Sequence, residues 1–188
     1  LEAWRARMGA QRADRVRDIS AMRGTSMHTY LEGYIKDERH LDLTALGQEA
    51  GRMADVVIRS GLGDLEEVWG TEVTLYYPGL YAGATDVVGI YNGRESIIDF
   101  KQTNKPKRRE WIEDYFIQLA AYAMAHNHVY DTHIQQGVIL MCSKDGFFQK
   151  FVVSDKEFKD YKYAFLKKVD YYHENCTKNK NSQDTKND

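Results

Sequence analysis

One hairpin signal restricts the fold of this chain more than any other feature of the sequence. Two runs rich in β-branched and aromatic residues, 81–91 and 95–101, flank the dipeptide Asn92-Gly93. A two-residue type I′ turn needs positive φ at both central positions, which asparagine and glycine tolerate better than other residues. The sequence therefore predicts a tight β-hairpin whose turn fixes the register of its two strands.

The hairpin brings two carboxylates and a lysine together. Asp86 lies on the first strand, whereas Asp99 and Lys101 are two residues apart on the second and project from one face. The residues beside Asp99 are apolar, and a partly buried carboxylate needs a partner or a metal ion. One interpretation is a plain ion pair between Asp99 and Lys101. The other is a site for a hard cation such as Mg²⁺ or Mn²⁺, which prefers oxygen ligands.

In the second interpretation, Asp86, Asp99 and the backbone carbonyl of Phe100 supply oxygen atoms to the cation. The cation would polarise a phosphate and activate a water molecule. Lys101 would orient that water or stabilise the developing negative charge. A basic cluster follows directly, and we interpret it as a segment that contacts phosphate; it comprises Lys101, Lys105, Lys107, Arg108 and Arg109. This combination favours phosphodiester hydrolysis.

The bulk composition is that of one globular domain. A chain of 188 residues with a net charge of −2 suits a single domain over residues 1–176, in which 1–22 form an N-terminal helical segment that we interpret as truncated. The polar residues 177–188 predict a disordered tail. No apolar run reaches the ~20 residues that a membrane helix needs. The two cysteines exclude a four-cysteine iron–sulfur site and suit a reducing, intracellular compartment.

Apolar periodicity predicts an α/β domain. Helices are expected over 2–22, 25–36, 45–60, 111–126 and 155–175, with Gly24 separating the first two. Strands are expected over 72–77, 81–91, 95–101, 134–142 and 147–153. This order predicts a central mixed β-sheet of about five strands flanked by helices. His28 and Glu32 share one helix face, where they form either a surface pair or part of the lining of a cleft. We interpret His126 as a surface or loop residue.

Four short motifs, in this order, resemble those of RecB-type nucleases of the PD-(D/E)xK superfamily. They are RGTSMH at 23–28, GATD at 83–86, DFK at 99–101 and QLAAY at 118–122. The opening AWRARMG at 3–9 further resembles the branch that contains phage exonucleases and the mitochondrial genome maintenance exonuclease. The resemblance extends over about residues 3–175 and implies a restriction-endonuclease-like core. Some members of the superfamily hold an iron–sulfur cluster on four cysteines, so no cluster is expected here.

The resemblance also implies roles for individual residues. His28 would be a metal ligand together with Asp86, Asp99 and the Phe100 carbonyl, and Lys101 would be the catalytic lysine. Together with the basic cluster, the resemblance predicts DNA contacts from a further set: Arg23, Thr103, Lys105, Lys107, Gln118 and Tyr122. Glu32 and Glu72 are expected as outer-shell or second-metal groups.

These features predict a Mg²⁺- or Mn²⁺-dependent DNA exonuclease that acts on single-stranded ends in replication, repair or recombination. We expect it in the cytoplasm of a bacterium or a phage-infected host, with an organelle as the alternative. Two other functions compete with this one. The first is a structure-specific endonuclease with the same site, and the second is a catalytically silent DNA-binding module.

Overall fold

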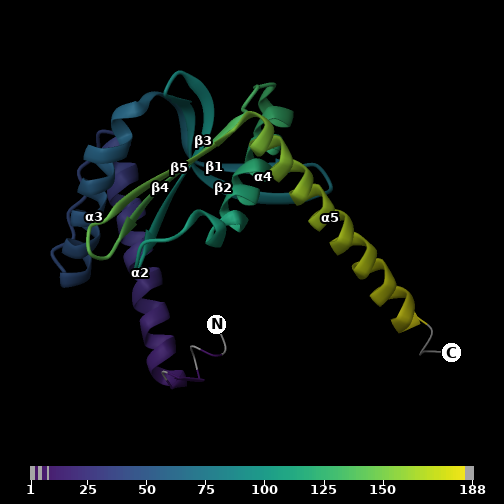
Figure 1. Ribbon diagram of the computed structural model, residues 1–188, viewed down its shortest axis with the longest axis horizontal. Coiled ribbons are helices and arrows are strands. Elements are labelled where there is room, and N and C mark those ends of the chain that lie inside the picture. The colour runs from purple at the N-terminus through teal and green to yellow at the C-terminus, as the bar shows by residue number, and fades with distance from the viewer. Residues whose placement is uncertain (1–2, 4–5, 8, 185–188) are drawn as a thin grey trace.

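The computed structural model describes residues 3, 6–7 and 9–184, and side chains as far as residue 175. A five-stranded sheet is covered on both faces by helices (Figure 1). The strands are β1 (Leu65–Tyr77), β2 (Tyr81–Tyr91), β3 (Arg94–Thr103), β4 (Gln136–Ser143) and β5 (Phe148–Ser154). The helices are α2 (Ala10–Ile35), α3 (Ala45–Gly61), α4 (Glu113–Tyr130) and α5 (Asp155–Asp184), with short 3-10 turns η1 (Leu62–Asp64) and η2 (Arg109–Trp111).

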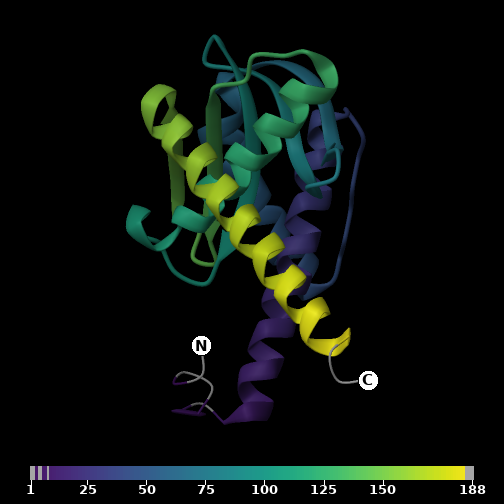
Figure 2. The same cartoon turned by 90° about the vertical axis from the view of Figure 1, so that its right-hand side faces the viewer.

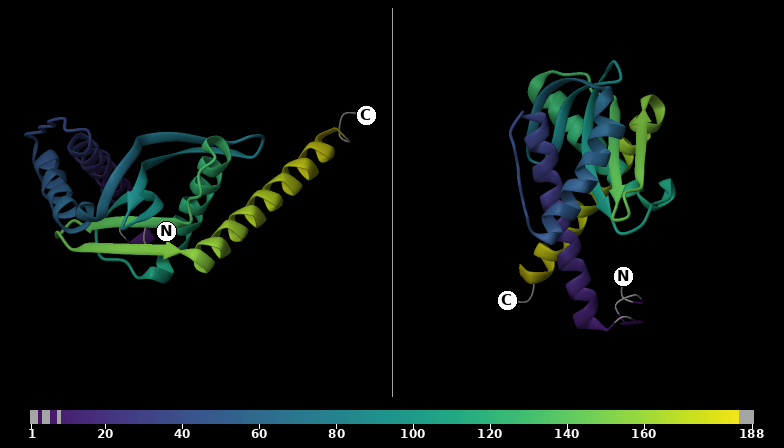
Figure 3. Two further views of the ribbon diagram at one scale, coloured as in Figure 1. Left: turned by 90° about the horizontal axis from the view of Figure 1, so that it is seen from above. Right: turned by 90° about the vertical axis from the view of Figure 1, so that its left-hand side faces the viewer.

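The sheet is mixed, as the sequence predicts. Its strand order is β1-β2-β3-β4-β5, with β3 and β4 parallel and every other neighbouring pair antiparallel. Parallel neighbours need a long crossover, and α4 supplies it between β3 and β4. The views from above and from the side show α2 and α3 on one face of the sheet and α4 on the other (Figure 3).

Alternation along the strands divides the core into two apolar clusters. Ile98 and Phe100 pack with residues of α2 and α3, whereas Ile97 packs with α4 and the start of α5. Successive strand residues point to opposite faces, so Asp99 and Lys101 face the α4 side.

The predicted hairpin turn is confirmed. Asn92 has φ 49° and Gly93 has φ 74°, and Tyr91 pairs with Arg94 across the turn. The ladder between β2 and β3 runs back as far as Val87 and Ile98. Beyond that rung β3 continues through Thr103 paired with β4, so β2 and β3 diverge at the level of Asp86 and Asp99.

The helix break predicted at Gly24 is wrong. Helix α2 passes through this position without interruption. A Cβ atom at Gly24 would lie 3.3 Å from Cγ of Gln102, so the glycine allows the helix to approach the end of β3 closely rather than ending it.

Other boundaries also differ from expectation. Strand β1 begins at Leu65 rather than at residue 72, and α5 continues to Asp184, although a disordered tail is expected from residue 177. Each residue added to an existing helix gains one hydrogen bond, so elongation needs no new packing. Residues 185–188 of the expected tail, and part of the 3–9 motif, lie outside the described residues.

Both α2 and α5 extend beyond the sheet (Figure 2). No helix among the described residues is long and apolar enough to cross a membrane.

Candidate active site

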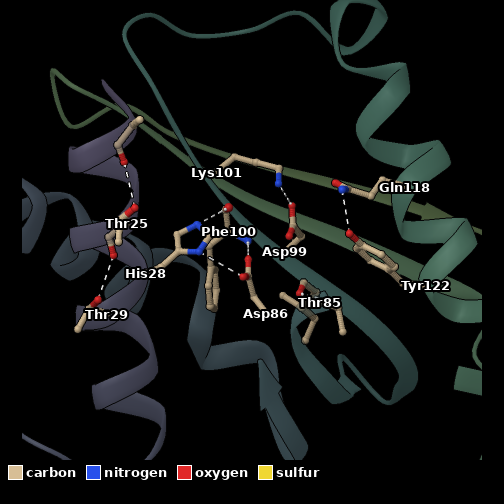
Figure 4. A network of polar contacts seen from close by, with 12 residues as sticks. Thr25, His28, Thr29, Thr85, Asp86, Asp99, Phe100, Lys101, Gln118 and Tyr122 are labelled. Carbon is tan, nitrogen blue, oxygen red and sulfur yellow. Dashed lines mark hydrogen bonds and ion pairs between the residues drawn. The ribbon is translucent and has the colours of Figure 1, made fainter. Parts of the chain in front are cut away.

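Where β2 and β3 diverge, two side chains bind the backbone of Phe100. The Phe100 N–H donates to Oδ2 of Asp86 at 2.6 Å, and Nε2 of His28 lies 2.9 Å from the Phe100 carbonyl oxygen (Figure 4). These two backbone groups lie past the last rung of the ladder, and a buried backbone group without a partner costs free energy. Asp86 and His28 therefore replace the missing strand pairing at this point.

His28 and Asp86 also contact each other. Nδ1 of His28 lies 3.2 Å from Oδ1 of Asp86, and the two side chains are 30% and 12% exposed. Burial opposes charge on the imidazole, but the Asp86 carboxylate outweighs it and raises the pKa of His28. Burial likewise opposes ionisation of Asp86, and the contact with His28 outweighs it and lowers the pKa of Asp86. With one ring nitrogen facing a carbonyl and the other a carboxylate, the imidazolium form satisfies both contacts while no cation is bound, whereas a cation would take the neutral imidazole as its ligand.

Asp99 and Lys101 form the second half of the site. Lys101 Nζ is paired with Oδ2 of Asp99, and Asp99 is 5% exposed. Burial raises the pKa of Asp99, with Lys101 opposing the shift and Asp86 adding to it. Burial disfavours the charged form of Lys101, but the Asp99 carboxylate outweighs this and raises the pKa of Lys101. The ammonium also lies 5.1 Å from the centroid of the Tyr115 ring, a cation–π distance.

Helix α4 brings the predicted Gln118 and Tyr122 to this place. Gln118 Nε2 donates to the Tyr122 hydroxyl at 2.9 Å, and both side chains lie across from Asp99 and Lys101 (Figure 4). Gly83 allows this arrangement, because a Cβ atom there would lie 2.5 Å from Cε1 of Tyr122. The absence of a side chain at Gly83, in the GATD motif, therefore leaves room for the ring of Tyr122, in the QLAAY motif.

Glu72 joins the site from β1. One donor atom from each of His28, Glu72 and Asp86 lies within 4.8 Å of the others. Glu72 has φ 49°, a left-handed conformation that is costly for a residue with a side chain and that gathers at functional sites. Burial raises the pKa of Glu72, with contributions from Asp86 and Glu32. Glu32 itself is paired with Lys36.

This donor set fits a divalent cation. It offers an imidazole nitrogen, the carboxylates of Asp86 and Glu72, and the Phe100 carbonyl oxygen, and the Asp99 carboxylate lies beside it. Oxygen-rich sets of this kind suit Mg²⁺ and Mn²⁺. Among the described residues, no other group of histidine, cysteine and carboxylate side chains converges in this way.

Two of the residues predicted to contact DNA are buried. Arg23 is 3% exposed; its Nε lies 3.2 Å from Oε1 of Glu49, and Nη1 donates to Oδ1 of Asn104 at 3.0 Å. Thr103 is 6% exposed and donates to the Lys105 carbonyl at 2.8 Å. These contacts hold both side chains inside the fold, and their contact with phosphate stays a prediction.

Sequence reasoning missed the role of Arg23 and its partners. Arg23 precedes the buried Met27 and Leu31 by four and eight residues, so helical spacing alone places it on the inner face of α2. Glu49 lies on α3 and Asn104 lies in the segment after β3. Nothing in the sequence shows that they contact Arg23. The ion pair with Glu49 joins α2 to α3, and the hydrogen bonds from Arg23 to Gln102 and Asn104 join α2 to the end of β3, five residues before His28.

The buried position of His126 is a further correction. The residue is 6% exposed, and its Nδ1 lies 2.7 Å from Oγ1 of Thr132. Helix α4 continues past it to Tyr130, and the rings of Tyr130 and Trp69 pack against the imidazole, with centroids 4.6 and 6.4 Å away.

The chain is similar in sequence to curated exonucleases. The chain is 28% identical over 156 residues to mitochondrial genome maintenance exonuclease 1 of Mus musculus, which covers 78% of this chain and 45% of that protein. The Xenopus tropicalis protein of the same name is 29% identical over 156 residues, covering 78% and 44%. The predicted resemblance to exonucleases of this kind is confirmed. This chain spans less than half the length of these curated relatives, and no family model matches it.

The fold agrees with a solved structure. A candidate exonuclease from Eubacterium rectale superposes with a TM-score of 0.62 at 16% identity, over 87% of this chain and 68% of that protein. The predicted fold class, a mixed five-stranded sheet flanked by helices, is therefore confirmed.

Proposed function

We propose that this chain is a Mg²⁺- or Mn²⁺-dependent DNA exonuclease that hydrolyses phosphodiester bonds from single-stranded ends. The observation that carries the proposal is the convergence of His28, Asp86 and the Phe100 carbonyl on one point beside the Asp99–Lys101 pair. The name of the curated relatives, mitochondrial genome maintenance exonuclease, supports exonuclease activity on DNA. We place the reaction inside a cell, in DNA replication, repair or recombination.

The ligands and the lysine have separate roles in this proposal. His28, Asp86 and the Phe100 carbonyl hold the cation, with Glu72 and Asp99 as the further carboxylates. A bound cation supplies Lewis acidity toward the phosphate and a lower pKa for its water. Lys101 keeps its positive charge, since its pKa is raised, and it stabilises the charge that develops on the phosphate oxygens.

The DNA strand is guided by residues around this point. Gln118 and Tyr122 border the site on the α4 side. Lys105 is exposed and Lys107 is half-buried on the loop between β3 and α4. We assign phosphate contacts to the two lysines, because exposed cations supply the sequence-independent part of nucleic-acid affinity.

Digestion of matched linear and circular DNA tests the proposal. We expect the protein with Mn²⁺ or Mg²⁺ to degrade end-labelled linear single strands and to leave covalently closed single-stranded circles intact. Asp99→Ala and Lys101→Ala should lower the rate by about 100-fold or more. Lys150→Ala is the control, because Lys150 pairs with Asp64 away from the site, at 2.8 Å.

The outcomes separate the competing functions. Cleavage of closed circles would show an endonuclease. Absence of cleavage, together with no Mn²⁺ binding in calorimetry, would show a silent DNA-binding module. Undiminished metal-dependent cleavage by Asp99→Ala and Lys101→Ala would refute the assignment of the site.

A further inference from the structure

The loop that leads from β3 to α4 is held in place by contacts to distant elements. The Gln149 side chain on β5 accepts the Lys107 N–H at 2.8 Å and donates to the Lys107 carbonyl at 2.8 Å. Arg109 donates to both carboxylate oxygens of Glu157 on α5, at 2.7 and 2.8 Å, and its guanidinium lies 4.8 Å from the Phe116 ring centroid. The backbone at Lys107 and the side chain of Arg109 are therefore fixed.

Between and beyond these anchors, two large side chains project into solvent. The Arg108 side chain is 72% exposed and Trp111 is 64% exposed. They contact each other, with the guanidinium carbon 5.3 Å from the centroid of the indole ring. Arg108 also has an exposed ion pair with Glu110 at 3.8 Å, which is weak at such a distance in water.

This pair has the chemistry of a nucleobase platform. An indole offers a flat apolar face on which any base can stack, and a guanidinium adds positive charge beside it for the phosphate. Single exposed apolar residues are normal on protein surfaces. Here, however, the tryptophan contacts an arginine on an anchored basic loop, and these two residue types are enriched among the residues that contribute most binding energy at interfaces.

The platform lies close along the chain to a residue of the candidate active site, because Trp111 precedes Tyr115 by four residues. The Trp111 N–H donates to the Arg108 carbonyl at 3.0 Å, and the Tyr115 N–H donates to the Ile112 carbonyl at 2.9 Å, so consecutive turns lead from the platform into α4. Tyr115 is the residue whose ring lies 5.1 Å from Lys101 Nζ. A strand with its scissile phosphate at Lys101 would thus have a neighbouring nucleotide at this loop.

We propose that Trp111 and Arg108 form a platform on which an unpaired base of the substrate strand stacks. A base in a duplex is already stacked and paired, so the platform favours single-stranded ends over paired ones. This inference rests on the proposed nuclease function, because it names the form of DNA that the same site receives.

Binding without cleavage tests the platform. The full chain in EDTA is titrated with a labelled oligothymidine strand and with a strand of the same length made of abasic sites, which keeps the phosphates and lacks the bases. Trp111→Ala should weaken binding to the thymidine strand by about tenfold and leave binding to the abasic strand unchanged. Trp111→Phe should retain most of the affinity, since it keeps an aromatic face.

Two further measurements make the result specific. The thymidine strand should quench tryptophan fluorescence in the wild type and not in Trp111→Phe. Arg108→Gln should lower affinity for both strands and reduce the salt dependence of binding. Phe147→Ala is the control, because Phe147 is another exposed aromatic residue, 56% exposed, on the turn between β4 and β5.

The platform is refuted if Trp111→Ala binds the thymidine strand as the wild type does, or if it loses the same affinity for both strands. Failure of the proposed function looks different, because wild-type protein would then fail to digest linear DNA with Mn²⁺ whatever the binding data show. A thermal midpoint for Trp111→Ala equal to that of Phe147→Ala confirms that the variant is folded.

Discussion

Replacing Arg23 by methionine should destabilise the fold through one buried ion pair. The guanidinium lies 3.2 Å from Glu49, and the two side chains are 4% and 21% exposed. At an effective dielectric of about 20, charges at this separation attract each other by roughly 5 kcal/mol. Part of that attraction is offset by the cost of removing both charges from water.

Removing Arg23 leaves the largely buried Glu49 carboxylate without its cation. It also removes the Nη1 donor that lies 3.0 Å from Oδ1 of Asn104. Breaking a buried pair in this way costs about 3–5 kcal/mol, and the remaining exposure of Glu49 places the expected loss at the lower end, about 3 kcal/mol. For a domain of this size, that loss lowers the thermal midpoint by roughly 6–12 °C.

Urea and thermal unfolding of matched variants measure the effect. Arg17→Met makes the same substitution on the same helix, at a residue whose side chain is 66% exposed and pairs with Asp14 and Asp18. It should cost less than about 1 kcal/mol. Adding Glu49→Gln to Arg23→Met removes the orphaned charge and should recover part of the loss. Equal shifts for Arg23→Met and Arg17→Met would show that the ion pair between Arg23 and Glu49 does not stabilise the packing of α2 against α3.

Three further changes test other parts of the structure. Gly83→Ala places a Cβ atom 2.5 Å from Tyr122; it should cost about 1–3 kcal/mol, and Tyr122→Ala in the same chain should relieve that cost in urea unfolding. Gly93→Ala forces a side chain into φ 74° and should cost about 1–2 kcal/mol, so an unchanged thermal midpoint would contradict the turn. Burial lowers the pKa of His126 below its usual 6.5, so the unfolded chain binds a proton first and stability falls as the pH drops below about 6.5; His126→Gln should flatten this dependence in urea midpoints measured at several pH values.

Local rules predicted the centre of the fold well. The Asn92-Gly93 turn fixed both flanking strands, and β2 spans the expected 81–91. Alternation along the return strand correctly placed Asp99 and Lys101 on one face. These features depend on the conformational preferences of a few adjacent residues, which a sequence states directly.

Features that depend on distant partners could not be predicted in the same way. Gly24 resembles a helix break because glycine is a poor helix former, yet its position reflects the close approach of Gln102. Helical spacing places Arg23 on the inner face of α2, but nothing in the sequence shows that Glu49 and Asn104 meet it there. The left-handed backbone of Glu72 and the approach of its carboxylate to His28 likewise leave no signal in the sequence around residue 72.

The divergence of β2 and β3 gives the site a spectroscopic reporter. The Phe100 amide proton is bound by a side chain that we propose to hold the cation, rather than by a neighbouring strand. In a ¹H–¹⁵N correlation spectrum this one resonance should therefore move when Mg²⁺ is added, whereas the amides of Ile97 and Ile98 within the ladder stay in place. Occupancy of the site could then be followed residue by residue, in the absence of DNA and without any turnover.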